Sequence, residues 1–470
     1  MSTPAVTRSA EYTAQAPPVY AGLGLFSTVL GTLLGVLLLP ERDATQAALV
    51  FPAAMLCTGL AIAPFAASLR DPKAILRLEH LLPFAVVYWL LLDLLQGDAV
   101  LLGLTSADVA NGFIAVGTFC AGCYGAALFA RWHVPGLVQR SVDRDVPPAL
   151  IFKLAVLCFA VGSFKYFYAV GFNPSKFIFF LGVGRWAAPW GPQTLGGWDA
   201  ILDHLPYFGF LVPVFGVTLG LRIGWLRGPT ILVFLMAVLL LLLLAQGGGR
   251  RVVGVMAGAP LITWILAQQR LDVRKLIVIG VAVASILYFM EVMLRYRNIG
   301  LAHYFYGDAA EEVAFDRVNV DDNFFRLCQI IKIIPDSHDY VYHQQLVYAL
   351  VRPIPRAIWQ GKPVGSGFNL AEFIGEKGLS LSVSVISEWY MSGGYIIVLI
   401  GGLIYGQLAR MMSALWAVTH LGVGRLLYAV CAMTLFAGVR SMTELVLMSY
   451  IVLAWLAIWW LFLRNRTDKD

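Results

Sequence analysis

Repeated runs of about 20 apolar residues, each long enough to cross the hydrocarbon core of a bilayer, constrain this chain most strongly. Of its 470 residues, 59% are hydrophobic and only 13% are charged. Backbone polar groups in hydrocarbon must be hydrogen-bonded within the protein, so the spans are helices or strands of a closed barrel. The runs are continuous rather than alternating, which predicts an all-α polytopic integral membrane protein.

We expect about twelve transmembrane helices. The first follows a mostly polar stretch and has no small-residue cleavage site, so it is expected to be retained as a helix. The predicted spans are 20–39, 46–69, 78–96, 110–130, 149–171, 205–225, 229–246, 250–268, 276–294, 385–409, 424–440 and 443–463.

The basic residues of the connecting loops predict the orientation. Lys and Arg occur in loops 70–77, 131–144 and 270–275 and in the tail after 463, whereas loop 97–109 contains none. Because basic loops stay in the cytoplasm, both termini are expected there and segment 295–383 on the outer side. The formal charge of +6 follows this topology and forms no basic tract, so no nucleic-acid partner is expected.

Three parts are expected along the chain. Residues 1–294 hold nine spans and a short amphipathic outer loop at 172–204, whose tryptophans are either an interfacial anchor or line the access route of a lipid-linked substrate. Residues 295–383 form an extramembrane subdomain with helices predicted at 323–335 and 344–351. Residues 384–470 hold the last three spans and the tail.

Arginines on the outer side are the candidates for binding an anion. Arg250 and Arg251 follow three glycines at the outer start of a span, where helix N–H groups and fixed charge together favour phosphate. The alternative is that they extend to lipid headgroups. Arg440 either joins them or forms an ion pair with Glu444. Arg352 and Arg356 are held by Pro353 and Pro355, with Lys362 close behind in the sequence.

A general base is expected among the outer carboxylates and histidines. Glu388 is the first choice because it lies where the long segment re-enters the membrane, and a carboxylate there is costly unless it is used or paired. Its alternative role is to orient Arg356 or Arg440. His303, His343 and Asp322 follow, although Asp322 or its neighbour Asp321 could instead cap a helix starting near Asn323.

No cofactor is expected. His338 and His343 are five residues apart without a third ligand, which argues against a metal site. The sequence contains no GxxxxGK[ST] phosphate-binding loop. If the protein is an enzyme, its driving force must therefore come from an activated substrate.

Three elements resemble Wzy-type oligosaccharide repeat-unit (O-antigen) polymerases, which share a general plan with O-antigen ligases. They are the pair Arg250-Arg251, the segment from Ile354 to Pro363, and Ser387-Glu388-Trp389-Tyr390 leading through Gly393-Gly394 into a span. The topology of many helices with one long outer loop late in the chain covers essentially its whole length.

The resemblance implies a glycosyltransferase of the bacterial inner membrane with a periplasmic active site. It would join repeat units carried on undecaprenyl diphosphate, using the outer arginines and Lys362 for the diphosphate, and Trp359, Trp389 and Tyr390 for the glycan. Its partners would be the lipid-linked oligosaccharide and membrane lipid, and whether a chain-length regulator protein is also needed stays open. The alternatives are a ligase that uses the same donor and a flippase or other transporter of lipid-linked oligosaccharide.

Overall fold

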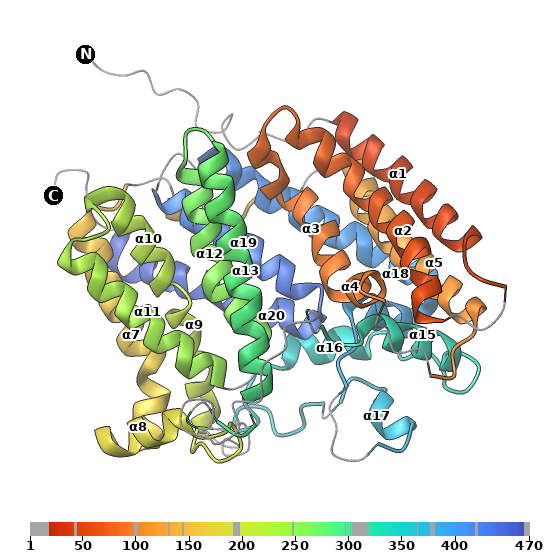
Figure 1. Ribbon diagram of the computed structural model, residues 1–470. Helices are drawn as coiled ribbons and strands as arrows, with labels where there is room; N and C mark the ends of the chain where they lie inside the picture. The colour runs from red at the N-terminus through yellow and green to blue at the C-terminus, as the bar shows by residue number, and fades with distance from the viewer. Residues whose placement is uncertain are drawn as a thin grey trace.

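A computed structural model of the chain describes residues 18–41, 45–97, 102–129, 132–142, 145–190, 198–246, 249–296, 298–300, 302, 318, 320–363, 365–376, 381–418 and 422–464. In these ranges the chain forms helices joined by turns, with no strand (Figure 1). Eleven of the helices are long and apolar enough to cross a membrane. The prediction of an all-α polytopic membrane protein is confirmed.

The helices follow the apolar runs closely. The span-forming ones are α1 (Pro18–Leu37), α2 (Gln46–Ser68), α3 with α4 (Leu78–Val86, Leu92–Leu95), α5 (Ser106–Gly125), α7 (Pro148–Ala169), α9 with α10 (Pro206–Gly209, Val212–Ile223), α11 (Gly228–Gln246), α12 (Arg250–Ala267), α13 (Val273–Tyr296), α18 (Val385–Ser413) and α20 (Met442–Ile458). The predicted span 424–440 corresponds to α19 (Gly422–Gly438), which is apolar but only 17 residues long.

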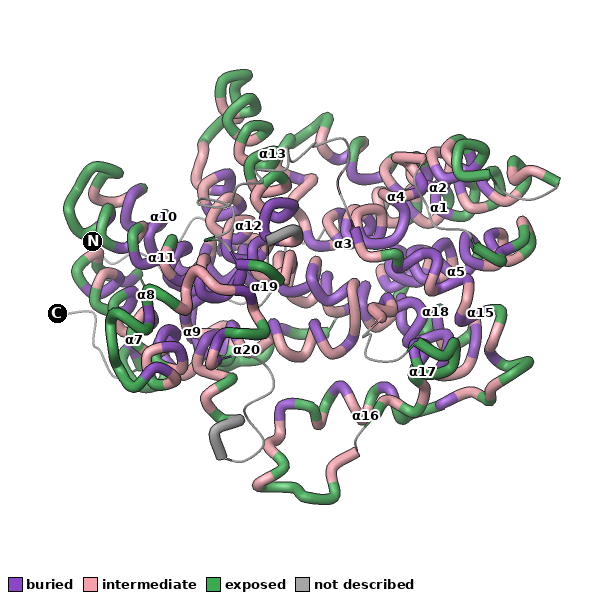
Figure 2. The backbone as a smooth tube through the Cα atoms, turned by 60° about the horizontal axis from the view of Figure 1, so that its bottom comes forward, coloured by how far each residue is buried: buried purple, intermediate pink, exposed green. Residues whose placement is uncertain are grey.

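Small residues allow the close contact between α18 and α5. A Cβ at Gly402 would lie 2.1 Å from the carbonyl oxygen of Phe119, and one at Gly406 would lie 2.3 Å from that of Cys123. Without a hydrophobic driving force between helices in lipid, such backbone contact supplies much of the packing energy. In contrast to the closely packed α18 and α5, α13 is mostly exposed or half-buried along its length (Figure 2), as expected for a helix that faces lipid.

The loops divide between two ends of the bundle. Lys73 is hydrogen-bonded to the carbonyl oxygen of Gln268, and Arg222 lies 2.6 Å from that of Val146, so the basic loops gather at one end. At the other end lie α8 (Pro174–Gly182), α15 (Asn323–Ile333), α16 (Gln344–Val351) and α17 (Leu370–Phe373) (Figure 1). We call this second end the outer end.

The helices of segment 295–383 are packed onto the spans. α15 lies against α5, where the rings of Phe324 and Phe113 are 5.4 Å apart. α16 packs on α20. Both helices begin and end close to the bounds that the apolar spacing predicts. The described part of this segment therefore forms an ordered cap on the outer end.

Candidate functional site

The helix that carries Glu388 is interrupted. Gly393 and Gly394 have non-helical dihedral angles, and Gly394, with φ 72° and ψ −159°, adopts a conformation that side chains disfavour. The interruption leaves the carbonyl of Met391 free to accept a hydrogen bond of 2.9 Å from the N–H of Val341. Residues 385–392, which we call the outer segment of α18, are therefore attached to the loop before α16.

Glu388 lies on the outer segment of α18 and is 6% exposed. Its Oε2 accepts a hydrogen bond of 2.5 Å from the N–H of Met442, the first residue of α20. A carboxylate is favourable there because a helix N-terminus exposes N–H groups and carries partial positive charge. Within the described part of the chain, Glu388 forms no ion pair with Arg356 or Arg440, and its Oε1 has no hydrogen-bond partner.

Three arginines and two carboxylates meet at the outer end, and we call them the arginine cluster. Oδ1 of Asp321 accepts a hydrogen bond of 2.5 Å from Arg250, and Oδ2 accepts one of 2.6 Å from Nε of Arg440. Arg251 pairs with Glu444, which also lies 3.5 Å from Arg440. The cluster joins the start of α12, the residues before α15 and the turn between α19 and α20.

The turn between α19 and α20 links the arginine cluster to Glu388. Ser441 begins α20 as its N-cap, and its hydroxyl accepts a hydrogen bond of 3.1 Å from the N–H of Glu444. Met442, which binds Glu388, lies between Arg440 and Glu444 in the sequence. The ion pair considered for Arg440 and Glu444 is present, although Asp321 is the closer partner of Arg440.

The charged groups of the cluster act strongly on one another. Burial would raise the pKa of Asp321, but the guanidiniums of Arg440 and Arg250 outweigh it and hold that pKa below its usual value. Burial acts to lower the pKa of Arg440, and the carboxylates of Asp321 and Glu444 nevertheless raise it above its usual value. Nε of Arg251 and one carboxylate oxygen of Glu444 are both buried without a partner in the described part of the chain, and the carboxylate of Glu388 also acts on Arg440. Guanidiniums held in fixed positions can contact an anionic group such as phosphate.

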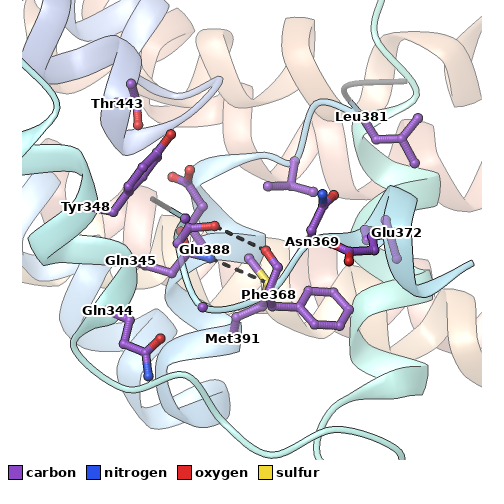
Figure 3. A pocket seen from close by; sticks show the side chains of 15 residues that line it. Gln344, Gln345, Tyr348, Phe368, Asn369, Glu372, Leu381, Glu388, Met391 and Thr443 are labelled. Atoms are coloured by element: carbon purple, nitrogen blue, oxygen red, sulfur yellow. Dashed lines mark hydrogen bonds between the residues drawn. The ribbon is translucent and has the colours of Figure 1, made fainter. Parts of the chain in front are cut away.

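A cavity of about 680 Å³ opens beside Glu388 and Thr443. Figure 3 shows Tyr348 and Thr443 on one side of Glu388, and Phe368 and Asn369 on the other. The volume lies within the range of about 300–1,000 Å³ that is usual for small-molecule sites. The polar groups of the wall are the amides of Gln344, Gln345 and Asn369, the hydroxyls of Tyr348, Ser366 and Thr443, and the carboxylates of Glu372 and Glu388.

The loop after α16 carries the other predicted cations. Nζ of Lys362 donates hydrogen bonds of 2.7 Å and 2.8 Å to the carbonyls of Arg352 and Ile354, so its ammonium group holds the loop together. Burial and the nearby charges of Arg352 and Arg356 lower the pKa of Lys362. The guanidinium of Arg352 contacts the hydroxyl of Tyr348 and lies 5.4 Å from the centre of its ring.

The structure brings only part of the predicted diphosphate site together. Arg250, Arg251 and Arg440 share the arginine cluster. Arg352 is joined to the cavity wall through Tyr348, and Arg356 is exposed, with no partner found in the described ranges. Convergence of Arg352 and Arg356 on the cluster stays a prediction.

Two of the residues expected to stack on glycan have packing roles. The ring of Trp389 is buried against Gly401, where a Cβ would come within 2.4 Å of it. Tyr390 is also buried, and its hydroxyl lies 3.4 Å from the carbonyl oxygen of Ile334. Neither residue lines the cavity. Trp359 is 42% exposed on the loop after α16, where it remains accessible to a ligand.

Glu388 is the predicted base that lines the cavity. His343 is exposed at the N-cap position of α16 and lies outside the cavity wall. Asp322 occupies the N-cap position of α15 without a side-chain cap, and its carboxylate lies 4.0 Å from Arg326. His303 lies outside the described residues. Among the described residues, no group of three or more His, Cys, Asp or Glu is arranged to hold a metal ion.

Gln246 is a polar residue that sequence reasoning missed. Its Nε2 donates hydrogen bonds of 2.6 Å and 2.7 Å to the carbonyls of Phe180 and Val183, and its Oε1 accepts one of 2.9 Å from Trp190. It thereby fixes the aromatic outer loop to the end of α11, close in sequence to Arg250. A single amide at the end of the long apolar run of α11 was the signal for such a role.

Comparisons of this chain with models of protein families, with curated protein sequences and with solved structures give no match.

Proposed function

We propose that this protein is a glycosyltransferase that polymerises oligosaccharide repeat units carried on undecaprenyl diphosphate, at the periplasmic face of a bacterial inner membrane. One observation carries the proposal. Glu388 lines a polar cavity large enough for sugars and is hydrogen-bonded to the turn that holds Arg440. Glycosyl transfer from a lipid diphosphate needs a base for the attacking hydroxyl and cations for the leaving group, and both are available here.

In the proposed step, a hydroxyl oxygen of the acceptor's terminal sugar attacks the anomeric carbon of the donor glycan. A bond forms between these two atoms while the bond from the anomeric carbon to the diphosphate oxygen breaks. Its electron pair leaves with the lipid diphosphate, and Oε1 of Glu388 takes the hydroxyl proton. The arginine cluster stabilises the charge that develops on the leaving group, because its guanidiniums are fixed before the reaction starts.

Two rings of the cavity and the loop after α16 have supporting roles in this scheme. Phe368 and Tyr348 lie on opposite sides of Glu388 and would flank the sugar that presents the hydroxyl (Figure 3). Arg356 is exposed on the loop after α16 and would bind a phosphate of one of the two lipid-linked substrates.

The test is an assay of the purified full-length protein in lipid nanodiscs with undecaprenyl-diphosphate-linked repeat units. Wild-type protein should give a ladder of longer glycans, with or without a chelator. Glu388→Gln keeps the side-chain shape and removes the base, so it should lower the rate by about 100-fold or more. Glu376→Gln is the matched control, because Glu376 is exposed shortly after α17 and does not line the cavity.

Other outcomes of this assay would replace the proposal. Transfer of the glycan only to an unrelated acceptor would identify a ligase. Translocation of the lipid-linked unit across vesicles without longer products would identify a transporter. A Glu388→Gln variant that elongates glycan at the wild-type rate would remove Glu388 from the base role.

A further inference from the structure

We infer that the cavity beside Glu388 takes an uncharged, hydroxyl-rich terminal sugar and discriminates against a sugar that bears a carboxylate. The inference rests on the proposed function, because it names the class of acceptor that this site accepts. It is based on the chemistry of the cavity wall and on the contacts that nearby cations make.

The wall combines negative charge with neutral hydrogen-bonding groups. Two carboxylates, Glu372 and Glu388, line the cavity, and no Lys, Arg or His is found among its described wall residues. The amides of Gln344 and Asn369 can each donate and accept hydrogen bonds, which matches a hydroxyl group that does the same. A neutral sugar therefore finds partners here, whereas a sugar carboxylate finds the exposed carboxylate of Glu372 and no cation among the described wall residues.

Three cations, one in the arginine cluster and two in the loop after α16, already have partners. Arg440 binds Asp321 and Glu444, and the ammonium of Lys362 binds two backbone carbonyls of its own loop. The guanidinium of Arg352 contacts the hydroxyl of Tyr348. A sugar carboxylate placed in the cavity would find no cation among the described wall residues, and burying it unpaired is unfavourable.

Phe368 supplies the apolar face that a pyranose ring needs. Its ring is held by contacts with His338 and Phe373, whose centres lie 4.8 Å and 5.6 Å away. A fixed aromatic ring binds the C–H face of a sugar with little loss of side-chain freedom. Phe368 thus takes the role that the sequence suggested for Trp389.

The first experiment compares matched acceptors. Synthetic undecaprenyl-diphosphate-linked disaccharides are prepared in pairs whose terminal residue is glucose, galactose or mannose, or the corresponding hexuronic acid. For at least one pair the neutral member should be elongated, and its acidic partner should be elongated at least about tenfold more slowly, since the cavity wall offers a sugar carboxylate like charge and no cation. Glu372→Gln should narrow this difference, and Glu376→Gln should leave it unchanged.

The second experiment measures binding without catalysis. Saturation-transfer NMR is recorded on the wild-type protein with the soluble disaccharides of the same pairs at millimolar concentration. Transfer should be seen for a neutral member, should be much weaker for its acidic partner, and should be lost in Phe368→Ala.

The outcomes separate the inference from the proposed function. Equal elongation of neutral and acidic acceptors would overturn the inference and leave the polymerase standing. Binding of neutral sugars without any elongation would support the inference and count against the polymerase. Preferred binding of the acidic members, or no binding of any neutral member to the folded wild-type protein, would overturn the inference.

Discussion

The Nε atom of Arg440 lies 2.6 Å from Oδ2 of Asp321, although 119 residues separate them in the sequence. The same carboxylate binds Arg250 through its other oxygen. A single aspartate thus fixes two guanidiniums from different helices in one orientation. Fixed orientation matters because a preorganised cation stabilises developing charge without having to move during the reaction.

Removing this carboxylate should destabilise the outer end. Asp321→Asn keeps the shape of the side chain but removes the anion that Arg250 and Arg440 share, and we expect a loss of about 2 kcal/mol in stability. Thermal unfolding of the detergent-solubilised protein measures it. Asp322→Asn is the control, because its carboxylate is exposed and 4.0 Å from its nearest cation, and it should change little.

The contribution of Asp321 should also depend on pH. Its folded pKa is lowered by Arg440 and Arg250 despite burial, so its stabilising effect is complete above the unfolded value of about 3.9 and is lost as the pH falls through the lower folded value. The difference in thermal midpoint between wild type and Asp321→Asn should be constant from about pH 8 to about pH 5 and shrink below about pH 4. A difference that grew on acidification would contradict the ion pairs.

Gly394→Ala should disturb the site through the backbone. The φ of 72° at Gly394 is unfavourable for a side chain, and the new Cβ would come within 2.9 Å of the hydroxyl of Tyr340. We expect a cost of about 1–3 kcal/mol and reduced polymerisation. Gly280→Ala in α13 is the control, because its Cβ meets nothing within 4 Å. Equal unfolding midpoints for the two variants would show that the break in α18 is not required.

Gln246→Ala should release the aromatic outer loop. The substitution leaves the indole N–H of Trp190 and two carbonyls without partners, at a cost of about 1–3 kcal/mol. Hydrogen exchange of residues 177–190 should become faster. Gln268→Ala is the comparison, since the Gln268 amide binds only a carbonyl of its own helix, that of Trp264. Unchanged exchange in Gln246→Ala would mean that apolar contacts alone hold the loop.

Arg356→Lys tests whether phosphate is bound through a planar, two-pronged contact. Arg356 is exposed and has no partner in the described ranges, so the substitution should leave the thermal midpoint unchanged. Polymerisation should fall by about tenfold or more, because lysine keeps the charge but not the paired N–H groups. Near-normal glycan length with the Arg356→Lys variant would show that only the positive charge at this position is needed.

The sequence predicts the helices well because the backbone of an apolar run in lipid must satisfy its own hydrogen bonds, which a helix does. The expected spans 250–268 and 276–294 correspond to α12 (Arg250–Ala267) and α13 (Val273–Tyr296). The apolar pattern of 385–409 also predicts a helix, but not its break at Gly393 and Gly394. Hydropathy reports which residues prefer lipid and carries no information on dihedral angles.

The sequence identifies individual residues of the site but not their arrangement in space. Glu388 and Arg440 stand out because charge near a membrane boundary is costly. Their partners depend on tertiary packing, as with Asp321, which is 71 residues from Arg250. Closeness in sequence does not place two side chains in the same site. Neighbouring helical residues point about 100° apart, so Trp389 is buried away from the cavity that Glu388 lines.

The interruption of α18 also changes how the site is joined to the membrane span. A helix whose apolar length exceeds the local bilayer thickness responds by tilting. The outer segment of α18 is attached to the loop before α16 and to the start of α20, and not through continuous helix to the rest of its span. A change in the tilt of the span would therefore reach Glu388 through side-chain contacts such as that of Trp389 with Gly401, and not through a continuous helix.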